Sequence, residues 1–300
     1  MPQPLVTIGI PCYNCAPHLP MLIRSIQAQT YPHWRVIAID DGSQDGTADF
    51  LRSIADSRFQ VLIDNENLGL ARRLNQIADL AQGDLLARTD ADDILLPHRI
   101  ERQVQAFVED QRLDVCSSGL YVVDNHNRVR GLRRVPELAQ SARDVMLRNG
   151  PSHPTVMSTR SWALQNRYRC EYRRGEDLDL WIRTIEVSRI RILPEALHII
   201  REDTQFDGVK YQNTIRDHRQ VVRHYLSKNG DVMDMVAVQG RMLVRSWVYQ
   251  SAVSLGCANW LAGRRNLPLS AADRAAIVSF LDGISAPSVE GEQTFSPVSV

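Results

Sequence analysis

Short apolar runs alternate with amphipathic stretches over the first third of the chain. The apolar runs are rich in β-branched residues, as strands are, and occupy residues 5–11, 34–40, 59–64 and 84–89. The stretches between them have apolar residues at helical spacing and occupy residues 18–30, 45–55 and 69–82. Because strands alternate regularly with helices, the pattern predicts an α/β fold with a mainly parallel sheet flanked by helices.

The pattern becomes less regular in the middle of the chain. Further short strands are predicted for residues 113–132, with a turn at 124–127, and for residues 189–194 and 196–201. Helical spacing is found at residues 141–149 and 175–187. These elements extend the same α/β domain, which we expect to cover residues 1–205.

Beyond residue 205 the apolar positions follow only helical periods, at residues 213–230, 231–256 and 270–283. The last of these segments has Ser270 as a predicted N-cap and Gly283 as its stop signal. We therefore expect a C-terminal helical region over residues 206–284. Residues 285–300 are rich in Ser, Pro and Glu, a composition that predicts a disordered tail.

Composition excludes several classes of protein. Lys and Arg together number 35, as do Asp and Glu, so no basic field points to a nucleic-acid partner. No apolar stretch reaches the roughly 18 residues that cross a bilayer, and the N-terminus lacks the features of a signal peptide. Cys12 and Cys15 form a CxxC with no second metal-binding pair, and we interpret them as small buried side chains. A cytoplasmic location is therefore expected.

Acidic residues follow three of the four strands predicted in the first third of the chain. The carboxyl ends of parallel strands meet at one edge of a sheet, where ligands bind in such folds. Asp90 and Asp92 are separated by one residue. Because successive side chains of an extended chain point to opposite sides, both carboxylates point to the same side. Such a pair suits Mg²⁺ or Mn²⁺ with substrate phosphate completing the shell. The alternative is a solvated acidic turn.

Two other acidic pairs have a chemical and a structural interpretation each. Asp40 and Asp41 end the second predicted strand, where a carboxylate can accept the N–H of a pyrimidine base or can simply belong to the turn. Glu176 and Asp177 fall in the first turn of a predicted helix, whose dipole favours negative charge. They are either a general base at the rim of a site or an acidic helix start.

Six segments in order resemble the inverting glycosyltransferases of family 2, which have the nucleotide-sugar-binding GT-A fold. They read VTIGIPCYN, VIAIDDGSQDGT, NENLGLARRLNQ, GDLLARTDADDILLPHRIERQ, HPTVM and GEDLDLWIR, and together they span residues 6–183. The resemblance implies that Pro11 and Tyr13 line the nucleotide pocket and that Asp41 binds the base. Arg72 or Arg73 would reach the base or a phosphate, and both remain candidates.

The same resemblance implies roles for the remaining candidates. Asp92 would bind the metal ion, Mn²⁺ or Mg²⁺, and Asp90 would contact the ribose or a metal-bound water. Asp177 would be the catalytic base, with Glu176 beside it, and His153 would lie in an acceptor-side segment. Many relatives have a His after the last strand that can face the metal. In this chain Asp203 occupies the position of that His. Either Asp203 binds the metal in its place, or the metal has one protein ligand fewer.

We therefore expect an enzyme that moves a single sugar from a nucleotide-diphosphate donor, a UDP-sugar above all, to a saccharide or lipid-linked saccharide acceptor. Bacterial surface polysaccharide or lipopolysaccharide synthesis is the expected context. A sugar nucleotidyltransferase and an inactive domain that binds sugar nucleotides or partners are the alternatives. The basic C-terminal helices contain Trp247 and Trp260. They predict a helical cap or homodimer contact, with peripheral membrane contact as the alternative.

Overall fold

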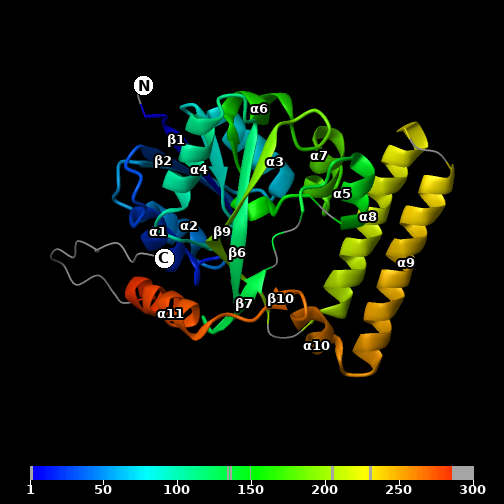
Figure 1. Ribbon diagram of the computed structural model, residues 1–300. Helices are drawn as coiled ribbons and strands as arrows, with labels where there is room; N and C mark the ends of the chain where they lie inside the picture. The colour runs from blue at the N-terminus through cyan, green and yellow to red at the C-terminus, as the bar shows by residue number, and fades with distance from the viewer. Residues whose placement is uncertain are drawn as a thin grey trace.

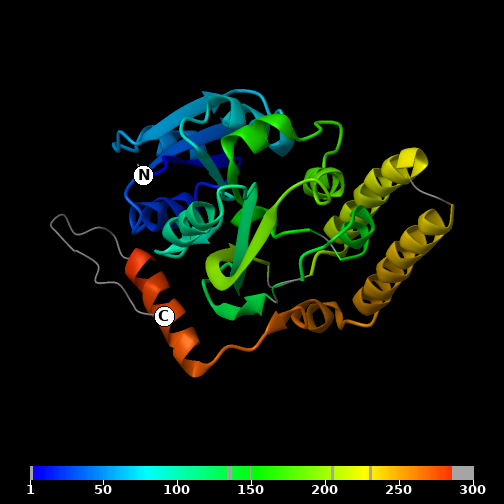
Figure 2. The same ribbon diagram turned by 45° about the horizontal axis from the view of Figure 1, so that its top comes forward.

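The computed structural model describes residues 3–133, 135, 137–148, 150–203, 206–229 and 232–285. The expected disordered tail lies outside these residues, except for Ser285, which ends the last helix. Figures 1 and 2 show a central sheet with helices on its faces and a pair of long helices standing to one side. The predicted α/β fold and the helical C-terminal region are both present.

The N-terminal half of the sheet is parallel, as predicted. Strands β1 (Val6–Cys12), β2 (Trp34–Asp41), β3 (Phe59–Asp64) and β4 (Leu85–Arg88) lie in the order β4-β1-β2-β3, and each neighbouring pair is parallel. The carboxyl ends of β1, β2 and β4 therefore meet at one edge. The loops that follow these strands carry the acidic segments singled out in the sequence.

The other half of the sheet is mixed. Strand β8 (Met157–Thr159) runs antiparallel to β4 and joins it to β6 (Val115–Val123), which pairs in parallel with β9 (Ile190–Arg201). The remaining strands pair antiparallel and are β5 (Ile94–Leu95), β7 (Val129–Arg133) and β10 (Asn266–Leu267). The two strands predicted at residues 189–201 form the single strand β9, with a register shift opposite β6.

Helices cover both faces of the parallel half. On one face α1 (Leu19–Gln27), α2 (Thr47–Arg52) and α4 (Arg99–Glu109) pack into the main apolar core. On the other face α3 (Leu70–Leu80) buries Ile77 against Ile37 and Ile39 of β2. A side chain on Gly9 of β1 would come within 2.5 Å of Ile77. The glycine thus lets α3 lie directly on the sheet.

A second core lies beside the mixed half of the sheet. Its helices are α5 (Ala142–Arg148), α7 (Glu176–Thr184), α8 (Gly208–Asn229) and α9 (Val232–Ser254), and Trp181 is buried among them. The short helices are α6 (Arg160–Gln165), α10 (Ala258–Gly263) and the 3₁₀ turn His153–Thr155. Helix α8 begins earlier than predicted because the Asp207 carboxylate accepts the backbone N–H of Lys210 at 2.8 Å.

The end of the described chain returns to the α/β domain. Strand β10 joins the main sheet beside β7, and α11 (Ala271–Ser285) packs Ile277 and Leu281 against β5, β6, β7 and β9 residues (Figure 1). The C-terminal region is therefore attached at both its ends, and its status as a unit separate from residues 1–205 stays a prediction. Among the described residues, no helix is both long and apolar enough to cross a membrane.

Candidate active site at the carboxyl edge of the sheet

The loops after β1 and β2 are fastened to each other at the carboxyl edge. The Ser43 hydroxyl accepts the backbone N–H of Asn14 at 2.9 Å, and the Asn14 side chain accepts the N–H of Gln44 at 2.8 Å. Asn14 adopts a left-handed backbone with a φ of 48°, which asparagine tolerates better than most residues. The two loops thus form one rigid rim. Tyr13 is half exposed on it and Pro11 is partly buried beneath it.

Asp41 and Arg73 form a buried ion pair at the end of β2. The Arg73 Nε donates to Asp41 at 2.6 Å, and the Asp41 carboxylate also accepts the backbone N–H groups of Leu68 and Gly69. Arg73 is 1% exposed and donates further to Asp64, Gln76 and the Glu66 carbonyl. Four of its five N–H donors are thus engaged, which leaves one for a ligand.

Arg72 and Asp40 differ from that pair in having unused polar groups. Arg72 is exposed and makes no ion pair within the described part of the chain, so its guanidinium is available to a ligand. Asp40 is 1% exposed, and its Oδ1 atom has no hydrogen-bond partner among the described residues. The choice between Arg72 and Arg73 stays open. Asp40 joins Asp41 as a candidate acceptor for a base N–H.

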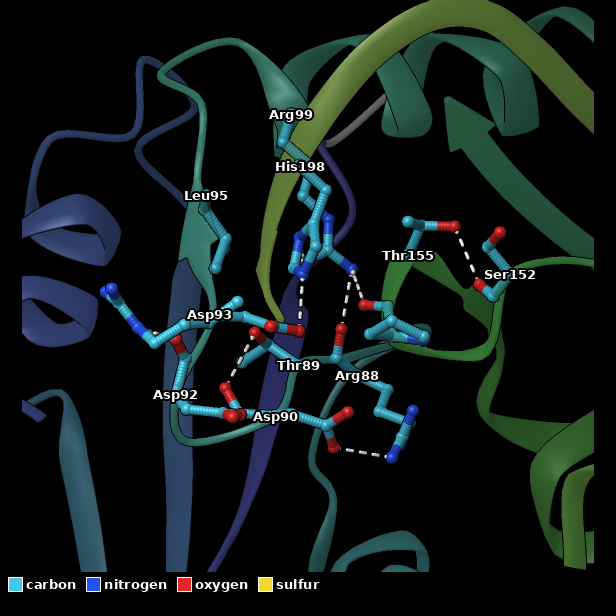
Figure 3. A network of polar contacts seen from close by, with 12 residues as sticks. Arg88, Thr89, Asp90, Asp92, Asp93, Leu95, Arg99, Ser152, Thr155 and His198 are labelled. Carbon is cyan, nitrogen blue, oxygen red and sulfur yellow. Dashed lines mark hydrogen bonds and ion pairs between the residues drawn. The ribbon is translucent and has the colours of Figure 1, made fainter. Parts of the chain in front are cut away.

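The three carboxylates in the turn after β4 differ in their hydrogen-bond partners (Figure 3). The Asp90 carboxylate accepts a 2.6 Å hydrogen bond from the buried Arg88 guanidinium. The Asp93 carboxylate meets the Nε2 atom of the buried His198 at 2.8 Å. No hydrogen bond to the Asp92 carboxylate is found among the described residues. Burial and then the neighbouring Asp90 charge raise the pKa of Asp92.

A buried polar network supports this turn from behind (Figure 3). The Arg99 guanidinium donates to the Arg88 carbonyl at 2.6 Å and to the Pro154 carbonyl at 3.1 Å, and it meets the Nδ1 atom of His198 at 2.9 Å. Burial lowers the pKa of Arg99 to about 9 and lowers the pKa of His198 well below its usual range. The imidazole is therefore neutral and bridges Arg99 to Asp93.

The residues near Asp92 fit a divalent cation only in part. Asp90 and Asp92 are hard oxygen donors, and the unbonded Asp92 carboxylate suits an ion. No group of three or more His, Cys, Asp or Glu placed to hold a metal occurs within residues that the structure describes. Asp203 lines the same pocket, but its carboxylate accepts the Asn125 side chain at 2.7 Å. Its role as a metal ligand stays a prediction.

His153 belongs to the core beside the site. It is 7% exposed, and its Nε2 atom lies 2.8 Å from the Tyr168 hydroxyl. Burial, and then the charge of Arg88, lower its pKa well below the usual range, so the ring is neutral. Its ring also packs edge-on against Trp181. These contacts support a positioning role, and direct contact with an acceptor stays untested.

Glu176 and Asp177 open helix α7 at the first turn, as the sequence predicts. Glu176 is 8% exposed, and burial followed by the Asp177 charge raises its pKa to about 7. Asp177 is more exposed, and its Oδ1 atom accepts the backbone N–H of Leu178 at 2.7 Å. The left-handed Gly175, with a φ of 96°, turns the chain into the helix and lies against His218. Asp177 is thus the more accessible of the two carboxylates.

A pocket of about 700 Å³ lies between the acidic turn and the C-terminal helices. That volume is in the range of small-molecule sites. Its acidic lining residues are Asp90, Asp92, Asp93, Glu202, Asp203 and Asp207. The other wall comes from α8, α9, α10 and β10. The C-terminal region, read from the sequence only as a cap, dimer contact or membrane contact, therefore builds half of the site.

Sequence reasoning missed three residues close to these carboxylates. His18 and Arg201 line the pocket, and both lower the pKa of Asp92 against the effect of burial. Arg88 lies within electrostatic reach of Asp90 and Glu176, and its Nε and Nη1 atoms are buried without hydrogen-bond partners among the described residues. A charged residue at the end of a buried strand was the available signal for Arg88. His18 carried no comparable signal.

The raised pKa of Glu176 makes stability depend on pH. The folded carboxyl titrates near 7 and the unfolded one near 4.5, so the unfolded state loses its proton first as the pH rises. Stability is therefore full below about pH 4.5 and falls until about pH 7, by about 3 kcal/mol from this group. In Glu176→Gln this loss disappears. Thermal melting at pH 5 and pH 8 measures the difference.

The matched control for that variant is Glu171→Gln, which alters an exposed carboxyl five residues earlier. It should keep the pH dependence of the unmodified protein. Parallel stability curves for Glu176→Gln and the unmodified protein would contradict the assignment.

Comparisons with known proteins identify the family. The profile described as glycosyl transferase family 2 matches residues 7–171. The putative glycosyltransferase EpsE of Bacillus subtilis is 37% identical over 210 residues, which cover 67% of this chain and 74% of that protein. A second relative is UDP-Glc:alpha-D-GlcNAc-diphosphoundecaprenol beta-1,3-glucosyltransferase WfgD of Escherichia coli. It is 28% identical over 187 residues, which cover 62% of this chain and 72% of WfgD.

Solved structures share the fold. S. aureus TarS residues 1–349 in complex with UDP-GlcNAc match with a TM-score of 0.60 at 16% identity, over 93% of this chain and 83% of that one. The complex with UDP matches with a TM-score of 0.57 at 17% identity, over 84% and 75%. At these identities the likeness concerns the fold alone, and it confirms the predicted GT-A architecture. The profile match covers more than half of the sequence, so the chain belongs to glycosyltransferase family 2.

Proposed function

We propose that this chain transfers a single sugar from a UDP-sugar to an acceptor hydroxyl, with inversion at the anomeric carbon. The observation that carries the proposal is the unbonded Asp92 carboxylate in a pocket at the carboxyl edge, with Glu176 of α7 within electrostatic reach of the neighbouring Asp90. The two S. aureus TarS structures are complexes with UDP and with UDP-GlcNAc. This favours a uridine nucleotide as the donor's leaving group.

Asp177 acts as the general base in this proposal. It sits in the first turn of α7, where the helix dipole helps to keep it ionised, and it is more exposed than Glu176. It takes the proton from the acceptor hydroxyl while that oxygen bonds to the anomeric carbon. The bond from the anomeric carbon to the diphosphate breaks on the opposite face, and the nucleotide diphosphate leaves with its electron pair.

Asp92 and Asp90 would hold a Mn²⁺ or Mg²⁺ ion in the proposed enzyme. A bound divalent ion would offset the charge that develops on the departing diphosphate. The chain itself contributes Arg88, His18 and Arg201 beside the same carboxylates. These groups limit the repulsion between the acidic residues and the substrate phosphates.

The proposed acceptor is a saccharide or a lipid-linked saccharide of bacterial surface polysaccharide synthesis. The name of the relative WfgD includes its acceptor, in which the sugar is joined to a lipid through a diphosphate. The wide pocket beside Asp92 has room for an acceptor as well as a donor sugar. Work at the inner face of the membrane would follow from such an acceptor.

Helix α9 exposes an apolar stripe, on the side away from its buried residues. The stripe consists of Met233, Val236, Leu243, Val244, Trp247 and Val248, which are 40–76% exposed. A contiguous apolar face of this kind marks an interaction surface. We propose that it forms a homodimer contact, and a lipid bilayer is the alternative occupant.

Asp177→Asn should lower turnover by roughly 100-fold to 10,000-fold, because a positioned base contributes that much to proton transfer. The asparagine cannot accept the proton but has the same shape. Transfer from a panel of UDP-, GDP- and dTDP-sugars measures the loss, and calorimetry with UDP should show nearly unchanged binding. An active Asp177→Asn protein would disprove the assignment of the base.

Asp92→Ala should weaken the binding of UDP in the presence of Mn²⁺ by at least roughly tenfold, since even groups one step removed from a bound ion cost that much when lost. Calorimetry with Mn²⁺ and with EDTA separates the metal-dependent part. The matched control is Asp93→Asn, whose carboxylate already pairs with His198. Equal UDP affinity in the Asp92→Ala and unmodified proteins, with Mn²⁺ present, would refute the metal site.

Replacing Val244 and Trp247 together by glutamate should abolish the proposed dimer. Each apolar side chain contributes about 1.5–3 kcal/mol when it is fully buried, so the double variant should be monomeric at concentrations where the unmodified chain is not. Sedimentation velocity over a concentration series measures this. If the unmodified chain is itself monomeric and floats with anionic liposomes, the stripe is a membrane surface instead.

A further inference from the structure

The pocket beside Asp92 has charges of both signs on its lining. The turn after β4 supplies carboxylates, and the wall formed by β7 and the C-terminal helices supplies cations, with Glu202, Asp203 and Asp207 also on the lining. Four of these cations come from four separate segments of the chain: Arg130 of β7, Lys210 of α8, Arg245 of α9 and Arg265 after α10. Residues so far apart in sequence reach one pocket because α8 and α9 stand beside the sheet (Figure 2) and the chain returns to it through α10 and β10.

Three of these cations have no ion-pair partner among the described residues. Arg130, Lys210 and Arg245 are exposed to the pocket, and none makes an ion pair with any residue that the structure describes. Arg265 lies 4.0 Å from Glu202, whose carboxylate is already held by Arg133 at 2.8 Å. Three of the four cations on this wall are therefore available to an anionic ligand.

Several surface arginines outside the pocket are paired within the chain. Arg52, Arg102 and Arg167 are each paired with a carboxylate, at 2.9, 2.5 and 2.6 Å. The pocket carboxylates that could do the same for the cationic wall are engaged locally. Asp203 binds Asn125, and Asp207 caps helix α8. Arg130, Lys210 and Arg245 are thus left without a direct ion pair among the described residues.

A buried hydroxyl lies among these cations. The Tyr211 ring lines the pocket and is fixed between Phe206 and Tyr249, with ring centroids 5.3 and 4.4 Å away. Its hydroxyl is buried and makes no hydrogen bond of good geometry among the described residues, although the Arg245 guanidinium lies near hydrogen-bonding distance of it. Arg245 and Arg265 are close enough for their charges to act on this phenol. A hydroxyl donor beside two guanidinium groups matches the oxygens of a phosphate.

From this geometry we propose that the Arg130, Lys210, Tyr211 and Arg245 wall binds a phosphate or diphosphate attached to the acceptor. The inference rests on the proposed glycosyl transfer and names its acceptor class: a saccharide joined to its carrier through a phosphate linkage. The diphosphate of the donor belongs with Asp90 and Asp92 on the other side of the pocket. The wall therefore selects the second substrate and holds its sugar toward the site of transfer.

The test compares two acceptors that carry the same sugar. One joins it to a short alkyl chain through a diphosphate, and the other is the neutral alkyl glycoside. The ratio of kcat/KM for the two acceptors reports the contribution of the phosphates. In the double variant Lys210→Gln with Arg245→Gln this ratio should fall roughly tenfold to a hundredfold, the effect of losing one or two charge-assisted hydrogen bonds.

The control double variant is Lys228→Gln with Arg241→Gln. Both residues are exposed on α8 and α9, make no ion pair within the described residues and do not line the pocket. The charge change is the same as in the test variant, and the ratio should stay at the value of the unmodified chain. If the unmodified chain uses both acceptors equally, or if the two double variants lower the ratio equally, the proposal is overturned.

A binding measurement keeps this inference separate from the proposed activity. With EDTA present, the metal-dependent contribution at Asp92 is removed, and inorganic pyrophosphate probes the cationic wall alone. Calorimetry should detect binding to the unmodified chain and to the control variant, and a loss of roughly tenfold or more in the Lys210→Gln, Arg245→Gln variant. Equal affinity in all three proteins would overturn the subsite even if transfer occurs. A chain that binds pyrophosphate but transfers no sugar would instead refute the proposed function.

Discussion

The site depends on how the fold accommodates the repulsion between three carboxylates that lie within four residues at the end of a buried strand. The fold holds them together because each has a different environment. Asp90 is paired with Arg88 and Asp93 with the neutral His198, whereas Asp92 accepts no hydrogen bond among the described residues. Removal of one partner of such a buried pair leaves an uncompensated charge, which is strongly destabilising. The arrangement therefore ties the stability of this turn to the exposure of one reactive carboxylate.

The same division of roles recurs at the end of β2. Asp41 is committed to Arg73 and to the backbone of the following loop, and it shapes the rim rather than remaining free. The adjacent Asp40 keeps one buried oxygen without a partner. At both strand ends, one acidic residue is held by other groups of the protein, and its neighbour has a carboxylate oxygen that a ligand can bind. A pair of acidic residues at a strand end therefore indicates a binding site better than a single one does.

The C-terminal helices change what the α/β domain can do. The carboxyl edge alone would present an acidic rim open to solvent. Helices α8, α9 and α10 close one side of it and add further cations to those at the rim. Helix α11 and strand β10 fasten the end of this region back onto the sheet, which holds the second wall in place. In the proposed enzyme, donor and acceptor would thus be bound by different parts of the chain.

The sequence by itself determined the α/β order, the parallel half of the sheet and the placement of acidic residues at strand ends, because these follow from local periodicity and from the geometry of parallel strands. The same pattern placed Glu176 and Asp177 at a helix start. It could not tell which carboxylates are free. Asp93 is hydrogen-bonded to His198, 105 residues away, and Asp41 is paired with Arg73, 32 residues away.

Only the tertiary structure decided the second wall of the pocket. Arg130 and Arg245 carry no local signal, since an exposed arginine on a strand or helix looks the same in sequence whether or not a carboxylate meets it. The C-terminal segment was expected to be a cap or a contact surface, and its part in the pocket emerged only with the folded chain. The physical reason is that charge compensation and burial depend on distances between side chains, which the chain order does not specify.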